Sequence, residues 1–348
     1  YMLTETCCQI DLIKLFKDGF CTGHGYLRAP QSIMSYASLA CIAIQANQNE
    51  MHGGQSVPNF DYSMAPGVAK TYIKEYYDAL AQSLEVRLGI GYADACAIAK
   101  NIKKELPDPT LSNADAFEAE LCKWFTQADD KFGLDGKVLV AAHKNAAETA
   151  LASTDKATFQ AMEALVHNLN TMNSRAGAQV PFSSVNYGTD TSPEGRMVMK
   201  NLLLATDNGL GNGETPIFPV QIFKVKEGIN YNPEDPNYDL FRLAIKTSAK
   251  RLFPNFSFID APFNLEYYKP GDYNTEVAYM GCRTRVMANT YDPSKAVTCG
   301  RGNLSFTSIN LPRLGIRANR DIDTFYKELD EEMDLVTRQL LHRFKIQC

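Results

Sequence analysis

Polar and apolar residues alternate near the start of the chain. In residues 6–13, "TCCQIDLI", Cys8 begins a series of apolar residues at every second position, whereas Cys7 begins a polar series. A period of two is typical of a β-strand, whose successive side chains point to opposite faces. The pattern predicts a strand with Cys8 on a face that packs under helices and Cys7 on a face that can line a wet cavity. Two buried thiols are the alternative.

Longer segments have helical spacing. Residues 32–51 carry small and apolar residues on one face, and a second helix is predicted over about 68–86. The residues between them, "HGGQSVPNFDYSMAPG", are rich in Gly, Pro and Asn and predict a loop that starts at His52. Ala-rich helical segments follow over residues 90–150 and indicate no particular chemistry.

From residue 155 onward, helices and strands alternate. Ser192 and Pro193 have the residue types expected at a helix cap and at the first helical position. The alternation implies an α/β fold with a largely parallel sheet and helices outside, open or closed into a barrel. Helices are predicted over 155–174, 192–209, 237–255 and 321–344, and strands over 178–188, 217–228, 256–263 and 303–315.

Composition narrows the class of protein. The 348 residues are 45% hydrophobic and 22% charged, as in a soluble globular protein. A net charge of −5 predicts no general attraction for nucleic acid, so any phosphate would need local basic groups and backbone N–H donors. No apolar run approaches a membrane span, and no signal peptide is recognisable, which predicts a cytoplasmic protein. We expect the chain to be a piece of a longer protein.

The nine cysteines have an odd count and irregular spacing, which predicts reduced thiols. No two are three residues apart, so no metal site is predicted. Besides Cys7, the candidate for chemistry is Cys282 in "YMGCRTRV", where Gly281 permits a tight backbone path and the neighbouring arginines would lower the pKa of a thiol. None of the five histidines sits in a partner motif, which disfavours a Cys-His hydrolase and favours redox or radical chemistry.

A second alternating pattern covers residues 303–309. Asn303 begins a polar series there, and Leu304 begins an apolar one. The pattern predicts a further strand that lines the same cavity as the first one. A strand with one face in water is the alternative.

Six segments together resemble one family. They are "TCCQIDL", "LACIAIQANQNEMHGGQSVPNFDYSMAPG", "NSRAGAQVPFSSVNYGTDTSPEGR", "GLGNGETPIFPVQIFKVKEGINYNPEDPNYDLF", "YMGCRTRV" and "GRGNLSFTSINLPRLG". They cover most of the chain outside about 74–165, and they resemble the catalytic subunit of the anaerobic (class III, glycyl-radical) ribonucleoside-triphosphate reductases. The resemblance implies a ten-stranded α/β barrel of two five-stranded halves, joined by a finger loop that carries the radical cysteine.

This resemblance implies a division of the chain and roles for three residues. The chain would be one incomplete catalytic domain, with the first barrel half over about 1–275, the finger loop over 276–302 and the start of the second half over 303–348. Cys282 matches the finger-loop cysteine, which becomes a thiyl radical and takes the 3′ hydrogen of the substrate ribose. Cys7 matches the cysteine that supplies a reducing hydrogen as the 2′ hydroxyl leaves as water. Asn303 matches an asparagine near the ribose.

The nucleotide pocket and the reductant follow from the same resemblance. We expect Ser183, Ser184, Asn186 and Arg283 to contribute to binding of the ribonucleoside triphosphate. Formate is the expected reductant, because Cys282 is followed by Arg-Thr-Arg rather than by an acid. The nucleotide effectors would be ATP and deoxynucleoside triphosphates, and the partners a radical-SAM activating enzyme and a second copy of the chain that pairs near residues 32–72.

Some segments of the family have no counterpart here. These 348 residues contain neither its glycyl-radical motif nor its four-cysteine zinc site, and the isolated chain is therefore predicted to have no turnover. Two alternatives remain open. One is another glycyl-radical enzyme of the pyruvate formate-lyase type, although its adjacent cysteines lie on the finger loop. The other is a non-catalytic truncated nucleotide-binding fragment.

Overall fold

One sheet organises the molecule. The computed structural model describes residues 5–132, 136–174, 179–281, 284–289, 291–295 and 297–347. The strands of the sheet lie in the order β10-β1-β4-β5-β6-β7; β1, β4, β5, β6 and β7 are parallel, and β10 is antiparallel to β1. Their bounds are β1 (Thr6–Gln9), β4 (His52–Val57), β5 (Ser183–Tyr187), β6 (Val220–Val225), β7 (Asn255–Phe258) and β10 (Gly302–Asn303).

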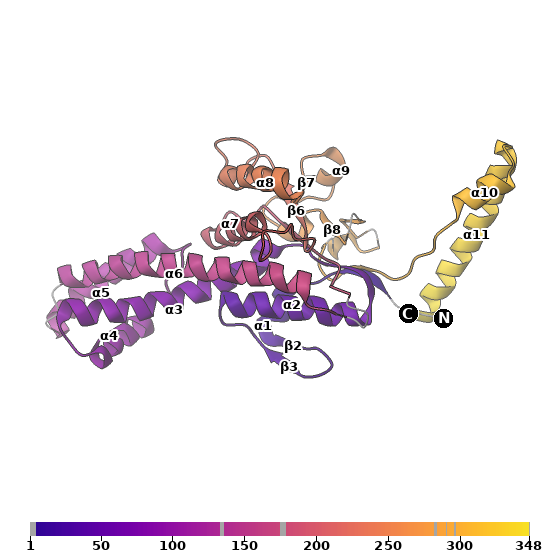
Figure 1. Cartoon of the computed structure of the whole chain (residues 1–348). Coiled ribbons are helices and arrows are strands. Elements are labelled where there is room, and N and C mark those ends of the chain that lie inside the picture. The colour runs from indigo at the N-terminus through magenta and orange to yellow at the C-terminus, as the bar shows by residue number, and fades with distance from the viewer. Residues whose placement is uncertain are drawn as a thin grey trace.

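The main helices cover only one face of this sheet (Figure 1). The parallel strands follow one another in chain order, and right-handed crossovers in one direction place all connecting helices on the same side. Val57, Val185 and Phe223 point from the strands into the core beneath these helices. The helices are α1 (Leu12–Asp18), α2 (Ile33–Glu50), α3 (Phe60–Leu88), α6 (Gly136–Thr171), α7 (Pro193–Asn208) and α8 (Tyr238–Arg251).

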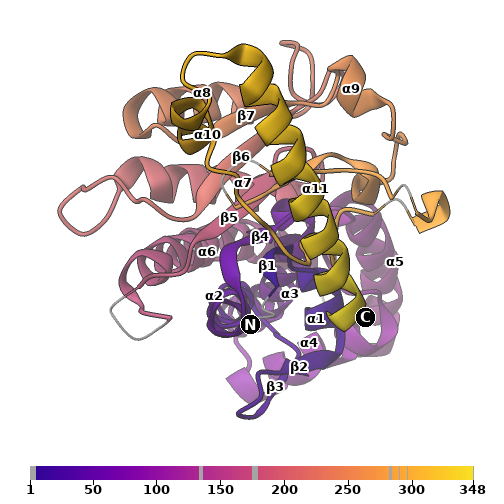
Figure 2. The ribbon, with the colours of Figure 1, turned by 90° about the vertical axis from the view of Figure 1, so that its right-hand side faces the viewer.

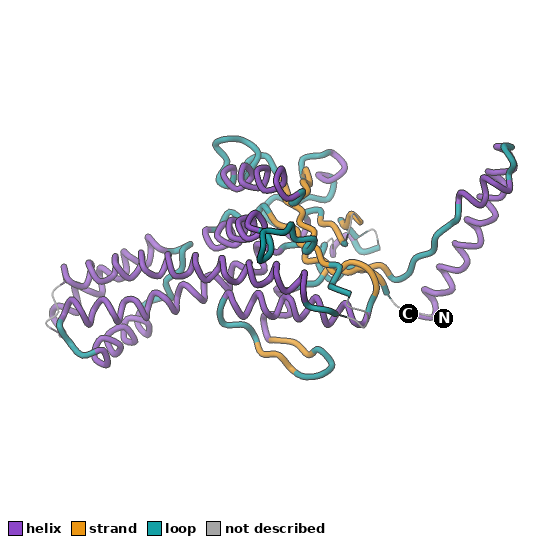
Figure 3. Tube along the Cα trace, in the orientation of Figure 1, coloured by secondary structure: helices purple, strands orange, loops and turns teal. Residues whose placement is uncertain are grey.

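The long connection between β4 and β5 extends away from the sheet as a helical bundle (Figure 3). The outer parts of α3 and α6 pack there with α4 (Tyr92–Glu105) and α5 (Ala114–Phe132) around a second apolar cluster. Tyr76, Leu121 and Leu139 are buried in that cluster. The bundle therefore has a core of its own, distinct from the core under the sheet.

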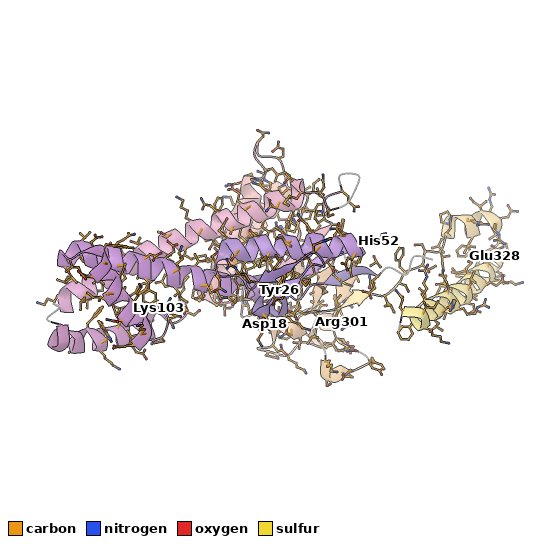
Figure 4. All side chains as sticks on the ribbon, turned by 90° about the horizontal axis from the view of Figure 1, so that it is seen from below. Asp18, Tyr26, His52, Lys103, Arg301 and Glu328 are labelled. Carbon is orange, nitrogen blue, oxygen red and sulfur yellow. The ribbon has the colours of Figure 1, made fainter. Side chains whose placement is uncertain are left out.

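Two small hairpins complete the body: β2 (Gly19–Cys21) with β3 (Tyr26–Arg28), and β8 (Ala278–Met280) with β9 (Thr284–Val286). The short helices are α9 (Pro262–Leu265), η1 (Tyr273–Thr275) and η2 (Pro293–Lys295). The last two helices, α10 (Leu311–Arg317) and α11 (Ile322–Gln347), stand apart from the body (Figure 1), and in the view of Figure 2 α11 lies in front of it. No residue of α11 is buried. Glu328 on α11 and Lys103 on α4 lie toward opposite ends of the molecule (Figure 4).

The structure confirms a mixed α/β fold with a parallel sheet, and it corrects three local predictions. The predicted loop from His52 is strand β4 followed by the first turns of α3, and the first strand ends at Gln9. The strand predicted over 303–315 pairs only at Gly302–Asn303, and the rest finds no strand beside it among the described residues. No helix in the described ranges has the length and apolar character to cross a lipid bilayer.

Candidate functional site

The face of the sheet opposite the helices carries polar side chains and the β8–β9 hairpin, and we term it the hairpin face. Gln9, Ser56 and Ser184 are aligned across β1, β4 and β5 by the register of the parallel ladder. Asn186 and Lys224 lie on the same face, farther along β5 and β6. All five are buried. A polar surface in this position needs specific partners, because buried polar groups without hydrogen bonds are costly.

The hairpin is attached to this face by its backbone at Tyr279. The Tyr279 N–H donates to Asn186 Oδ1 at 2.8 Å, and Asn186 Nδ2 donates to the Tyr279 carbonyl oxygen at 3.0 Å. The Ser56 hydroxyl donates to the same carbonyl oxygen at 2.7 Å. The Asn186 amide thus makes the pair of bonds that a neighbouring strand would make.

Two glycines meet where the hairpin turns. A Cβ atom added to Gly54 of β4 would lie 2.1 Å from Gly281 Cα, and Gly281 has a φ of +51°. Only glycine permits both the contact and, without strain, the left-handed backbone. The next residues, Cys282 and Arg283, lie outside the described residues, so the site is built from their neighbours.

Cys7 adjoins Gly54, one of these two glycines. The Gly54 N–H donates to Cys7 Sγ at 3.2 Å, and Thr6 Oγ1 lies 3.8 Å from that sulfur. Cys7 has a φ of +52°, within an irregularity of the β1 ladder between Thr6 and Cys8. Such a bulge redirects a side chain. Gly54 therefore contacts both the Cys7 thiol and the residue that precedes Cys282.

Cys8 points to the helices instead. Its thiol donates to Gln55 Oε1 at 3.1 Å and accepts from Asn47 Nδ2 of α2 at 2.8 Å. Burial raises the pKa of the Cys8 thiol to about 12, so it stays protonated at neutral pH. The alternation along β1 correctly placed Cys8 under a helix, while the chemical role of Cys7 stays a prediction.

The structure distributes the other predicted residues over both faces. Asn303 pairs with Thr6 across the β10–β1 ladder and is therefore next to Cys7 in the neighbouring strand. Ser184 lies on the hairpin face, in line with Ser56. Ser183 pairs with Gln55 and so points toward the helices, away from Cys7. His52 and Arg301 lie at the side of the body that faces α10 and α11 (Figure 4).

Two groups on the hairpin face have unused hydrogen-bonding capacity. Among the described residues, neither the Nε2 nor the Oε1 atom of Gln9 has a partner, although the side chain is only 1% exposed. The Ser184 hydroxyl is likewise buried and without a partner in the described part of the chain. Unsatisfied buried groups at one face are typical of a site that binds a polar ligand or ordered water.

Charged groups surround the start of the hairpin segment. Lys224 and Glu276 form a buried ion pair at 2.9 Å. Burial raises the pKa of Glu276, and Lys224 opposes that shift. Nearby, Asp61 accepts the N–H groups of three successive residues, 188–190. Burial and the Asp61 charge raise the pKa of Asp190 to about 6.

Sequence reasoning missed Gly54 and Lys224. The sequence contained a clue to Lys224, because this residue continues the alternating apolar series of Val220 and Ile222 in a strand that is otherwise apolar. Gly54 lies in a segment that the sequence pattern predicted to be a loop. In the described ranges, no group of three or more His, Cys, Asp or Glu side chains has a metal-binding arrangement.

Comparisons with known proteins point to one family. A family model described as anaerobic ribonucleoside-triphosphate reductase matches residues 1–348. The chain is 27% identical over 338 residues to the anaerobic ribonucleoside-triphosphate reductase of Escherichia coli (strain K12), covering 97% of this chain and 38% of that protein. It is 27% identical over 343 residues to the protein of the same name from Enterobacteria phage T4, covering 97% and 46%. The chain thus spans less than half the length of these relatives.

Proposed function

The chain belongs to the anaerobic ribonucleoside-triphosphate reductase family, and on that premise we propose that it forms the part of such an enzyme where a ribonucleoside triphosphate is reduced to a deoxyribonucleoside triphosphate. One observation carries the proposal. Gly54 contacts both the Cys7 thiol and Gly281, the residue before Cys282. Two thiols that must act on one ribose need to be close together, and this contact supports that proximity.

The architecture supports a barrel half. The parallel strands β1, β4, β5, β6 and β7 are five in number, and their helices lie on one face. We propose that residues 1–275 form one half of a ten-stranded barrel, 276–302 the finger loop inside it, and 303–348 the start of the other half. The polar hairpin face would then be the interior of the barrel, closed to bulk water as radical chemistry requires.

Each residue has a chemical task in this proposal. A glycyl radical on a segment outside these 348 residues supplies the unpaired electron. The Cys282 thiyl would take the 3′ hydrogen of the ribose and return it to C3′ at the end of the cycle. The 2′ hydroxyl would leave with a proton as water, and the Cys7 thiol would deliver a hydrogen atom to C2′. Two electrons balance the replacement of C–OH by C–H, and formate supplies them as it is oxidised to carbon dioxide. Asn303 would orient the ribose hydroxyls by hydrogen bonds.

The structure refines the proposed nucleotide contacts. Among the described residues the Ser184 hydroxyl on the hairpin face has no hydrogen-bond partner, and Ser184 stays a candidate for substrate binding. Asn186 is engaged by the Tyr279 backbone, so we assign it to positioning the hairpin. Ser183, on the opposite face, would act only through its neighbours. Arg283 as a phosphate ligand, the nucleotide effectors, the radical-SAM activating enzyme and the homodimer remain predictions.

Substitution of the cysteines tests the proposal in the longer reductase that contains this chain. After activation, Cys282→Ser should form the glycyl radical, seen by electron paramagnetic resonance, yet yield no deoxynucleotide. Cys7→Ser should still release label from 3′-tritiated substrate but block normal product. Cys8→Ser, matched in size and neighbouring in sequence, should retain most of the activity. An active Cys282→Ser enzyme would refute the assignment.

The isolated chain provides a second test. We expect the 348 residues, mixed with an activating enzyme, S-adenosylmethionine, formate and a ribonucleoside triphosphate, to form no deoxynucleotide, because they contain no glycyl-radical motif. Deoxynucleotide formation would contradict the requirement for that segment.

A further inference from the structure

A buried ion pair joins the sheet to the segment that leads into the hairpin. Lys224 Nζ lies 2.9 Å from Glu276 Oε2, with side chains 0% and 4% exposed. Lys224 is on the hairpin face of β6, and Glu276 precedes β8 by two residues. Water cannot replace either partner at this depth, so each charge depends on the other.

Two further side chains bind the pair from other elements. Asn59, just before α3, accepts a hydrogen bond from Lys224 Nζ at 3.1 Å through Oδ1. The Thr189 hydroxyl, after β5, donates to Glu276 Oε2 at 2.8 Å. The Asn59 Nδ2 atom also lies 3.7 Å from Cys299 Sγ, on the returning side of the loop. One cluster therefore contacts the segments before and after the hairpin.

The attachments of the segment follow a line across the sheet. Glu276 is held at β6 by Lys224. Tyr279 is held by Asn186 of β5 and Ser56 of β4. Gly281 then rests on Gly54, whose N–H bonds the thiol on β1. The chain thus crosses from β6 to β1 and reaches the Cys7 side at the turn.

We propose that Lys224 and Glu276 are positioning residues that set the register of this segment on the hairpin face, so that Gly281, the residue before Cys282, rests on Gly54 beside the Cys7 thiol. The inference rests on the proposed function and extends it to residues that never touch the substrate. A shift of the segment along the sheet would leave both charges buried and unpaired. The ion pair therefore excludes alternative registers, whereas the backbone bonds of Tyr279 could form equally with another residue.

Amide hydrogen exchange tests the anchor in the chain itself. The double variant Lys224→Met/Glu276→Leu removes both charges and keeps apolar bulk, which avoids an unpaired buried charge. We expect exchange in residues 278–280 and 284–286 to become at least tenfold faster, with exchange in β5 unchanged. The matched control, Lys226→Met, removes an ion pair to Asp260 at 2.5 Å, two residues along the chain, and should leave the hairpin unchanged.

The results separate positioning from general stability. Hairpin exchange within twofold of the wild type, or an equal increase in β5, would overturn the proposal. In the activated longer enzyme, we expect the double variant to keep the glycyl radical signal and lose at least tenfold in kcat for deoxynucleotide formation, with KM changed less than threefold. An unchanged kcat would also overturn it. If the wild type made no deoxynucleotide, the proposed function would fail, while the exchange experiment would still decide whether the anchor exists.

Discussion

Replacement of Gly54 by alanine tests the contact on which the site depends. The added Cβ would lie 2.1 Å from Gly281 Cα, 2.9 Å from Gly281 N and 3.1 Å from Phe182 Cδ1. Carbon atoms in contact normally lie about 3.5–4.0 Å apart. The two backbones must therefore separate by roughly 1.5 Å, since the nearest atoms belong to the backbone and not to a flexible side chain.

The protein can accommodate this atom in two ways, and the less costly one sets the loss in the free energy of unfolding. Keeping the hairpin in place strains the packing, at a typical cost of about 1–3 kcal/mol. Lifting the hairpin breaks three hydrogen bonds at Tyr279, at roughly 0.5–1.5 kcal/mol each. Breaking all three bonds would cost about 1.5–4.5 kcal/mol. The less costly route, strained packing, therefore predicts a loss of about 1–3 kcal/mol in the free energy of unfolding. Because a misplacement of about 1 Å can cost ~100-fold in rate, activity should fall more than stability does.

Urea denaturation of Gly54→Ala and the wild type measures the loss, and Gly25→Ala is the matched control. No atom lies within 4 Å of a Cβ added to Gly25, and its φ is outside the left-handed region, so we expect a change below about 0.5 kcal/mol. If Gly54→Ala were as stable as the control and equally active in the longer enzyme, the close approach of Gly54 and Gly281 would be refuted.

Three further predictions concern single side chains. Gln9→Leu should raise the free energy of unfolding by about 1 kcal/mol or more, because it removes a buried amide without a partner among the described residues. A lower stability of this variant in urea denaturation would show that the amide is bonded. Asp190 has a folded pKa of about 6, above its unfolded value of about 3.9, so the protein should lose on the order of 2 kcal/mol of stability as pH rises from 4 to 6. Asp190→Asn should remove this slope, and equal slopes in denaturation series would contradict the shift. The half-buried Cys8, with a pKa of about 12, should be alkylated by iodoacetamide at pH 8 at least ~100-fold more slowly than the exposed Cys21. Similar rates by mass spectrometry would contradict the raised pKa.

Local patterns predicted the elements whose residues interact with near neighbours. Ser192 and Pro193 correctly marked the start of α7, since a cap is a contact within one turn: the Ser192 hydroxyl accepts the Gly195 N–H. The alternation after Cys8 indicated which face of β1 packs under the helices, because a strand has a period of two whatever its partners are. Both features depend on chain geometry that a short segment determines by itself.

Patterns were misleading where pairing depends on distant segments. The glycines of β4 indicate a loop, since glycine weakens a strand, yet Gly54 is needed for the approach of Gly281, 227 residues later. The alternation after Asn303 predicts a strand, but a strand needs a neighbour for its N–H and C=O groups, and β10 pairs only at Gly302–Asn303.

The sequence by itself determined the family and the α/β class, and it predicted chemical roles for Cys7, Cys282 and Asn303. Only the tertiary structure placed the Cys7 thiol on Gly54, and only it paired Lys224 with Glu276, 52 positions apart. The physical reason is the difference in range. Propensity, capping and alternation act within a few residues, whereas the burial of a charge or the contact of two backbones exists only after distant strands have been brought together.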